Sequence, residues 1–188
     1  TTRQLAYERD DLAEAEFALN SDAGGGDLNE HGKALVYNIQ AAEKTYVTWE
    51  ITARNPGGHS SRPRPDNAIY DLADAIAKIQ AHRFPVRWNP MTLEFFKVTG
   101  EQMGGELGDA MVRFANNPED TTASDRLAVE SSYVGTTRTT CVVTMLRAGH
   151  AENALPQSAT ATVNCRVFVG VPTAEVLKEL QRVIGNDA

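Results

Sequence analysis

The sequence predicts an α+β domain in which helices cover one face of an antiparallel sheet, in a split βαβ (ferredoxin-like) arrangement. Residues 46–53 and 158–169 alternate apolar and polar side chains with a period of two, which is typical of half-buried strands. Residues 66–82 and the segment after Thr173 repeat apolar side chains at helical spacing. From residue 43 the predicted order is strand, helix, strand, strand, helix. We therefore expect a domain over residues 43–188 that lacks the last strand of this arrangement.

The first predicted strand is followed by a glycine-containing loop, residues 55–63, and then by the first helix. Asp66 is the expected N-cap of that helix, because a carboxylate accepts hydrogen bonds from the first backbone N–H groups. The residues expected on the core face of the strand are Val47, Trp49, Ile51 and Ala53. The apolar stripe of the helix consists of Ile69, Leu72, Ile76 and Ile79.

Residues 86–136 have weaker patterning and are predicted to be a helical insertion. Short helices are expected near 92–99, 105–116 and 120–131. Regular structure resumes at residue 138.

The strands at 138–148 and 158–169 are expected to form a hairpin around a loop at Asn153. A symmetric register places Cys141 opposite Cys165 on the apolar face, which Met145 is expected to share. Because a disulfide between directly opposed strand residues must fit a narrow geometry, we interpret the two cysteines as reduced thiols that pack as small apolar side chains. The final helix is expected to begin with Thr173 as its cap.

Residues 1–42 are predicted to contain a helix at 4–17, a turn at 21–27 and a strand at 34–41. The segment starts without methionine or a secretory signal pattern, and we interpret it as the interior of a longer chain. Localisation is therefore not predicted.

The acidic composition argues against a nucleic-acid-binding protein. The formal net charge is −7, whereas nucleic-acid-binding surfaces are basic. The apolar runs are too short for a membrane-spanning helix. We expect neither nucleic acid nor a membrane as a partner.

Four residues are candidates for chemistry, and each also has an ordinary structural explanation. His59 could donate a hydrogen bond to an oxyanion, although most exposed loop histidines are simply solvated. Arg166 could bind a carboxylate with two parallel bonds, or form a surface ion pair. Asn153 could bind a substrate carbonyl, or only stabilise its turn. Asp22 could ligate a metal, but a single carboxylate is a weak signal.

Longer motifs combine these residues into a more specific pattern. GGHSSRPRPDNAI and RTTCVVTMLRAGHAENALPQSATATVNCRVFVGVP resemble the carboxypeptidase S-like branch of the two-zinc aminoacylase/carboxypeptidase family of metallopeptidases. Upstream, LNSDAGGG and QAAEKTY resemble the same branch, so that the resemblance covers nearly the whole chain in order. It implies that residues 1–42 are an incomplete segment of the zinc-binding α/β catalytic domain, and that residues 43–188 are the dimerisation (lid) domain.

The resemblance also implies roles for the candidate residues. His59 matches the lid histidine that reaches the partner subunit's active site and stabilises the tetrahedral intermediate. Asn153 and Arg166 match residues that hold the substrate's carbonyl and carboxylate, and Asp22 matches a zinc ligand. The other ligands and the general base lie outside this sequence, so we expect two zinc ions in the intact parent, none held by this fragment, and an inactive fragment.

The implied parent is a homodimer that cleaves peptides or N-acyl-amino acids. A different class of function is a non-catalytic ferredoxin-like module that binds a ligand or another protein, because this architecture supports many functions. An RNA-binding relative would need a basic surface with exposed aromatic residues, which the acidic composition disfavours.

Overall fold

The computed structural model describes residues 25–28, 30–40 and 42–185. The chain divides into two units, with the division between Ala42 and Glu43. In the part of the chain that the structure describes, no helix is both long and apolar enough to cross a membrane.

The first unit contains an antiparallel hairpin of β1 (Gly25–Leu28) and β2 (Ala34–Asn38). The strand predicted at 34–41 is thus present over its first five residues. The turn predicted at 21–27 is wrong in its last part, because Gly25 and Gly26 pair with Asn38 and Tyr37 as strand residues. The helix predicted at 4–17 lies outside the described residues.

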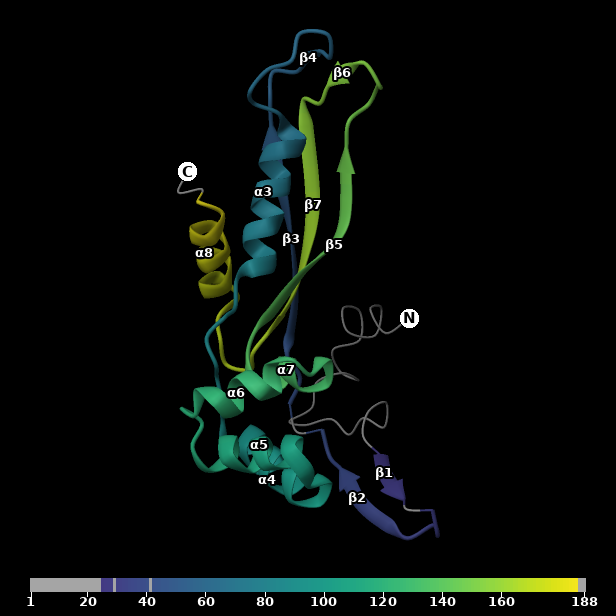
Figure 1. Ribbon diagram of the computed structural model, residues 1–188, viewed down its shortest axis with the longest axis vertical. Helices are drawn as coiled ribbons and strands as arrows, with labels where there is room; N and C mark the ends of the chain where they lie inside the picture. The colour runs from purple at the N-terminus through teal and green to yellow at the C-terminus, as the bar shows by residue number, and fades with distance from the viewer. Residues whose placement is uncertain (1–24, 29, 41, 186–188) are drawn as a thin grey trace, which may run out of the picture. The chain divides into compact units, whose positions relative to one another are not determined.

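The second unit is built on a three-stranded antiparallel sheet of β3 (Thr45–Arg54), β5 (Thr140–Ala148) and β7 (Ser158–Val167) (Figure 1). Its strand order is β3-β7-β5. β7 lies in the centre because its apolar face is the most complete: Ala159, Ala161, Val163, Cys165 and Val167 are all 0–1% exposed. The α+β class and the predicted strand and helix order are confirmed.

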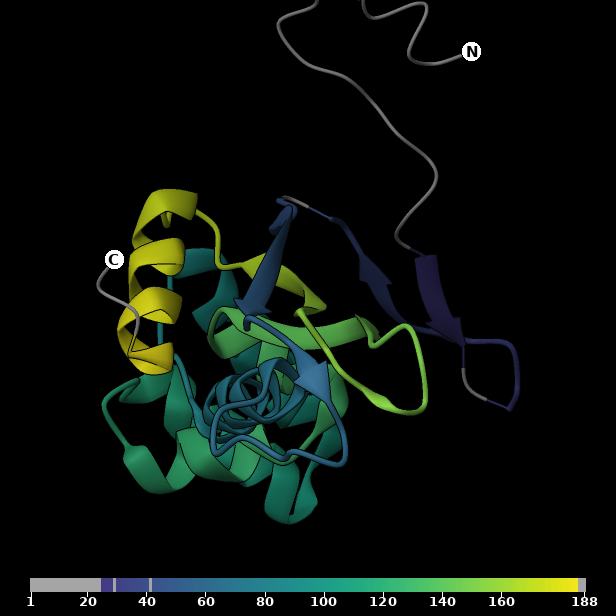
Figure 2. The same cartoon turned by 90° about the horizontal axis from the view of Figure 1, so that it is seen from above.

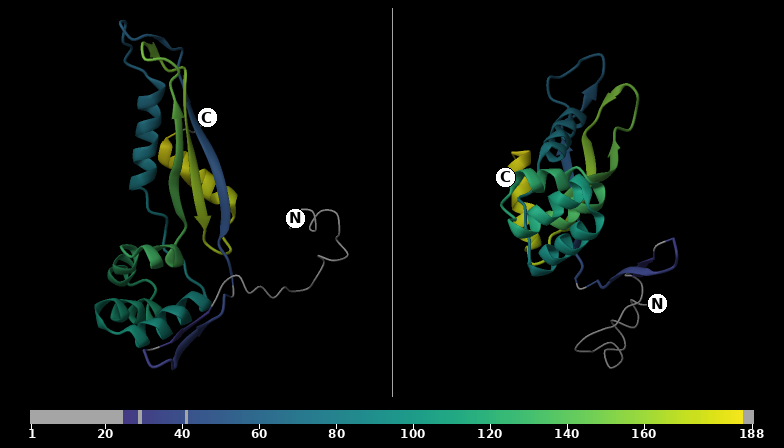
Figure 3. Two further views of the ribbon diagram at one scale, coloured as in Figure 1. Left: turned by 90° about the vertical axis from the view of Figure 1, so that its right-hand side faces the viewer. Right: turned by 60° about the horizontal axis from the view of Figure 1, so that its bottom comes forward.

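Helices α3 (Ala68–Ala81) and α8 (Thr173–Ile184) pack on this apolar face, and no helix within residues 42–185 packs on the other face (Figures 2 and 3). Ile79 of α3 and Leu180 of α8 meet Val163 in one core cluster. Both predicted caps are wrong. Asn67 caps α3 through a bond from the Ile69 N–H, and α8 starts at Thr173 with Pro172 in the cap position.

The insertion forms four helices: α4 (Pro90–Met103), α5 (Gly105–Asn116), α6 (Thr121–Ala128) and α7 (Ser131–Thr137). Three of them match the predicted helical segments, and α7 was missed. They enclose a second core of Phe96, Met111, Phe114, Ala123 and Leu127. In Figure 1 these helices lie at one end of the sheet, and the short strands β4 (Gly58–His59) and β6 (Ala154–Leu155) lie at the other.

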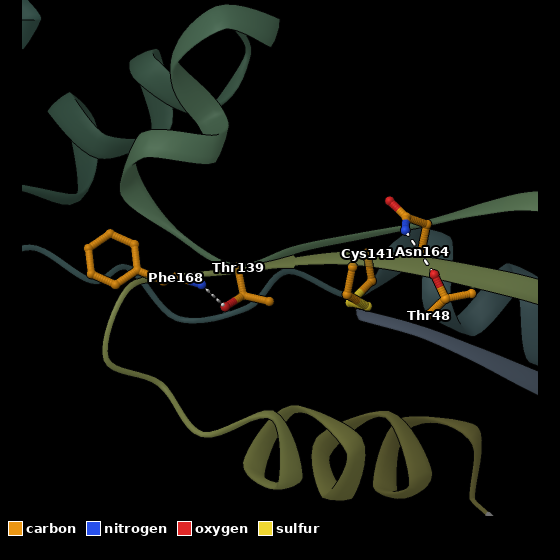
Figure 4. The surroundings of a disulfide bond; sticks show 6 residues. Thr48, Thr139, Cys141, Asn164 and Phe168 are labelled. Carbon is orange, nitrogen blue, oxygen red and sulfur yellow. Dashed lines mark hydrogen bonds between the residues drawn. A yellow bond between two sulfur atoms is a disulfide. The ribbon is translucent and has the colours of Figure 1, made fainter. Parts of the chain in front are cut away.

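The hairpin register is confirmed near the cysteines, but the chemistry expected there is wrong. Cys141 pairs with Cys165 in the sheet, and the two form a disulfide instead of remaining thiols (Figure 4). Their Cα atoms, on directly opposed strand positions, are 4.1 Å apart.

A β-bulge between Val143 and Met145 corrects the predicted face of β5. The extra residue moves Met145 opposite Thr162, on the face without helices, where Met145 is 63% exposed. Met145 therefore does not share the core face of Cys141.

Candidate functional site

His59 lies in a loop that two glycines fold back onto the β5–β7 hairpin. Gly58 pairs with Leu155 and His59 with Ala154 in a two-stranded sheet. Gly57 has φ +78°, and a Cβ atom built there would lie 2.7 Å from the Gln157 Cγ. A side chain at position 57 would therefore be strained by the backbone conformation and would crowd the Gln157 side chain.

The base of this loop is held by a polar cluster. The Asn55 side chain accepts a bond from Gly57 N (2.9 Å) and donates one to Asp66 Oδ2 (2.8 Å). Arg64 binds both oxygens of Asp66 through its Nε and Nη2 atoms. The bonds from Arg64, with smaller contributions from Asn55, lower the pKa of Asp66. This explains why Asp66 does not cap α3: its carboxylate is used to close the loop.

The His59 ring is oriented by Ser61. The Ser61 backbone N–H donates to His59 Nδ1 (3.2 Å), and the Ser61 hydroxyl lies 2.9 Å from the same atom. Because Nδ1 accepts from a backbone N–H, the neutral ring carries its proton on Nε2. The exposed histidine thus offers an N–H donor away from the loop.

Asn153 lies directly beside this histidine loop. Its backbone carbonyl accepts a bond from Ser60 N (2.9 Å), and the residue is exposed. The sequence-predicted pair of His59 and Asn153 is therefore brought together, on two segments nearly a hundred residues apart.

Arg166 lies on the face of the sheet that carries no helix. Its guanidinium carbon is 4.8 Å from the centre of the Tyr46 ring, a cation–π geometry that limits where the exposed side chain can lie. Lys44 is also near: burial, and then the charge of Arg166, lower the pKa of Lys44. The Lys44 ammonium donates to the Gly135 carbonyl at 2.7 Å.

Within the same chain, Arg166 lies far from the His59 loop. Ser158 begins β7 beside that loop, and Arg166 lies eight residues further along the same strand. At about 3.3 Å per residue this is roughly 26 Å. Within one chain, His59 and Asn153 therefore lie together and Arg166 lies apart from them.

Asp22, the predicted zinc ligand, lies outside the described residues. Within the ranges described, no group of three or more His, Cys, Asp or Glu side chains is placed to hold a metal ion. These residues therefore do not fit a zinc site.

Sequence reasoning missed Ser61 and Lys44. The hydroxyls that follow the histidine in GGHSS were a signal for Ser61, since a side chain two positions on commonly returns to a loop residue. No sequence pattern pointed to Lys44, because its position beside Arg166 depends on the pairing of β3 with β7.

The chain is similar to several proteins of known family. Over 154 residues it is 27% identical to the probable carboxypeptidase S-like 2 of Dictyostelium discoideum, covering 81% of this chain and 29% of that protein. It is 28% identical over 151 residues to the N-fatty-acyl-amino acid synthase/hydrolase PM20D1 of Xenopus tropicalis, and this match covers 79% of this chain and 29% of that protein. The chain thus spans under a third of the length of these relatives.

Among solved structures, an M20 family metallo-carboxypeptidase from Sulfolobus solfataricus aligns with a TM-score of 0.46 and 16% identity, covering 76% of this chain and 40% of that one. The family model described as the peptidase dimerisation domain matches residues 41–188. The chain therefore belongs to the dimerisation domain family of the M20 peptidases.

Proposed function

We propose that this chain is the lid domain, with an incomplete catalytic-domain segment at residues 1–42, of a zinc-dependent exopeptidase or amidohydrolase that cleaves peptides or N-acyl-amino acids. The observation that carries this proposal is the His59 loop. It holds an exposed imidazole whose Nδ1 is occupied by Ser61 and whose free Nε2–H is a suitable donor for a developing oxyanion.

The distance between His59 and Arg166 supports a homodimer in which the two residues of one chain serve different active sites. If His59 and Asn153 reach the partner subunit's active site, Arg166 at the far end of β7 serves the active site of its own subunit. Each site then receives its oxyanion donor and its carboxylate-binding group from different chains. The nearby Lys44 adds positive charge at the end of β7 where Arg166 lies.

Strand β5 is our proposed dimer edge. It is an outer strand of the sheet, and three of its apolar side chains are 55–64% exposed: Val142, Met145 and Leu146. The other outer strand, β3, borders a groove of about 370 Å³ lined by Leu72 of α3 and Leu180 of α8. We propose that this groove and edge receive the last strand of the lid.

Zinc belongs, in this proposal, to the intact parent, with Asp22 as one ligand. A metal in the parent would supply the activated water, while the lid residues bind and orient the substrate. We propose that the isolated chain is inactive, since it contributes the lid groups without the remaining ligands and general base. The alternative is a non-catalytic module of the same fold that binds a ligand or a protein.

Hydrolysis of N-acyl-amino acids and dipeptides by the full-length parent with added zinc tests the proposal. His59→Ala should lower kcat on the order of a hundredfold or more with zinc still bound, because one oxyanion donor is lost. His150→Ala, which removes another exposed loop histidine, should retain activity. If the wild type holds zinc but cleaves nothing, the binding-module alternative is favoured.

Mixed dimers test whether the His59 and Arg166 of one active site come from different subunits. When His59→Ala and Arg166→Ala subunits are co-expressed, half of the dimers are mixed, and each mixed dimer has one site with both residues intact. Activity should therefore recover to roughly a quarter of the wild-type value, far above that of either variant alone. No recovery would mean that both residues come from the same chain, which contradicts the proposed arrangement.

A further inference from the structure

Lys44 and Arg166 are two neighbouring cations on the open face of the sheet. Tyr46 of β3 pairs with Arg166 of β7, and Lys44 lies two residues before Tyr46. Because side chains alternate along an extended chain, Lys44 shares the face of Tyr46 and is the diagonal neighbour of Arg166. Long side chains at diagonal positions reach each other. No helix within residues 42–185 packs on this face, and the Arg166 side chain is exposed there.

The described residues provide no anion for this pair of cations. No Asp or Glu among them forms an ion pair with Lys44 or Arg166, although the chain has 25 acidic residues against 18 basic ones. Burial, and then the charge of Arg166, lower the pKa of Lys44, and no carboxylate opposes this shift. Two like charges repel each other, and a bound anion offsets that repulsion. The pair is therefore suited to bind negative charge on another molecule.

Both cations are held in place by contacts that leave hydrogen-bond donors free. The guanidinium carbon of Arg166 lies 4.8 Å from the centre of the Tyr46 ring, and the guanidinium donors lie in the plane of that group, along its edges. The Lys44 ammonium has three donors and gives one to the Gly135 carbonyl at 2.7 Å. A Cβ atom at Gly135 would lie 2.6 Å from the Lys44 Nζ, so that a larger residue on α7 would displace the ammonium.

The two cations suit two different carboxylates. The fork of a guanidinium matches both oxygens of one carboxylate, whereas an ammonium is a point charge that binds a single oxygen. A lone carboxylate on Arg166 leaves the charge of Lys44 unmatched. A ligand with two carboxylates a few bonds apart matches both cations. Glutamate and aspartate have this feature, because each carries an α-carboxylate and a side-chain carboxylate.

We propose that Lys44 is a specificity-determining residue that binds the side-chain carboxylate of a substrate ending in Glu or Asp, while Arg166 binds the α-carboxylate of the same residue. The inference rests on the carboxylate-binding role proposed above for Arg166. It names the preferred substrates of the hydrolase as N-acyl-glutamate, N-acyl-aspartate and peptides with an acidic C-terminal residue.

Hydrolysis of N-acyl-glutamate and N-acyl-glutamine by the full-length parent tests the proposal, because the two substrates have nearly the same shape and differ in side-chain charge. The wild-type kcat/KM should be on the order of tenfold higher for the glutamate substrate, which gains a charge-assisted hydrogen bond.

Lys44→Gln keeps an N–H donor for the Gly135 carbonyl and removes the charge. It should lower the glutamate-to-glutamine ratio to about one and leave kcat/KM for the glutamine substrate nearly unchanged. Lys97→Gln, at an exposed lysine of α4, is the matched control and should keep the wild-type ratio. A wild-type ratio near one, or a ratio that Lys44→Gln does not change, would overturn the proposal.

A binding experiment on the 188-residue chain separates this proposal from the hydrolase function. The probes are N-acetyl-glutamate and N-acetyl-glutamine at constant ionic strength, and the readout is the ¹H–¹⁵N cross-peak of the Arg166 Nε–H, assigned by its loss in Arg166→Lys. The wild type should bind the glutamate probe on the order of tenfold more tightly, and Lys44→Gln should bind both probes equally. Gly135→Ala, which displaces the ammonium, should also reduce the difference.

The two experiments together distinguish the possible failures. If the parent cleaves neither substrate but the chain prefers the glutamate probe through Lys44, the hydrolase function is wrong and the dicarboxylate site stands. Equal affinity of the wild-type chain for the two probes, or no shift with either, would overturn the site.

Discussion

Reduction of the Cys141–Cys165 disulfide should lower the free energy of unfolding of the second unit by an amount that follows from the sequence separation of the two cysteines. The bridge joins residues separated by 24 positions. The loop-closure entropy that such a bridge removes from the unfolded chain corresponds to about 3.4 kcal/mol at 25 °C. Reduction removes no side-chain atoms, and Cys165 stays in a core position with 0% exposure, so most of the effect should come from the unfolded state.

For a unit of this size the loss corresponds to a fall in Tm of roughly 7–14 °C. The measurement is thermal unfolding by circular dichroism with and without a phosphine reductant, together with a thiol count on the unfolded, unreduced protein. The Cys141→Ala/Cys165→Ala double variant is the control and should be insensitive to the reductant. Two free thiols in the unreduced protein, or equal Tm values in both conditions, would refute the reasoning and favour the reduced pair expected from the sequence.

Substitutions at three further positions test other parts of the structure. Gly100→Ala should lower the free energy of unfolding in urea by roughly 2–4 kcal/mol, because a Cβ atom there would lie 2.6 Å from the Gly108 carbonyl oxygen of the neighbouring helix. An unchanged unfolding midpoint would show that the α4–α5 contact is looser than this. Asn67→Ala should lower the free energy of unfolding by about 1 kcal/mol, because the N-cap hydrogen bond of α3 is lost. Asn67→Asp keeps an oxygen acceptor and should leave the free energy of unfolding nearly unchanged. Because the pKa of Asp66 is lowered in the folded chain, its contribution to stability should be complete above its ordinary value of 3.8 and be lost as the pH falls through the lowered value. Asp66→Asn should remove that part of the acid transition, and an identical acid profile would contradict the role of Arg64.

Most of the sheet and its helices could be predicted because their patterns are local. The alternation in β3 and β7 and the apolar stripe of α8 depend only on neighbours in the sequence. The register of the β5–β7 hairpin followed from symmetry about its loop as far as Val143. Beyond that point a single extra residue changed the face of Met145, and nothing in the apolar pattern marks such a bulge.

The candidate site residues could be singled out from the sequence, but their arrangement in space could not. His59 and Asn153 each stood out as loop residues, and their pairing follows from the bonds between β4 and β6. The separation of Arg166 from this pair depends on its position along β7, eight residues beyond Ser158. The burial of the Arg138 Nε and Nη2 atoms without a hydrogen-bond partner among the described residues could not be predicted, because it is a property of the assembled fold.

The bulge in β5 also limits how this edge can join another strand. An outer strand with a regular ladder can add partners without limit, which leads to aggregation. The register shift between Val143 and Met145 interrupts the row of backbone donors and acceptors, so that a straight strand laid along the edge matches one side of the bulge or the other. Only a partner shaped to the same kink can pair along the whole edge, and a second copy of β5 carries that kink. In the dimer that we propose, the extra residue would therefore favour pairing with a second copy of β5 over uncontrolled strand addition.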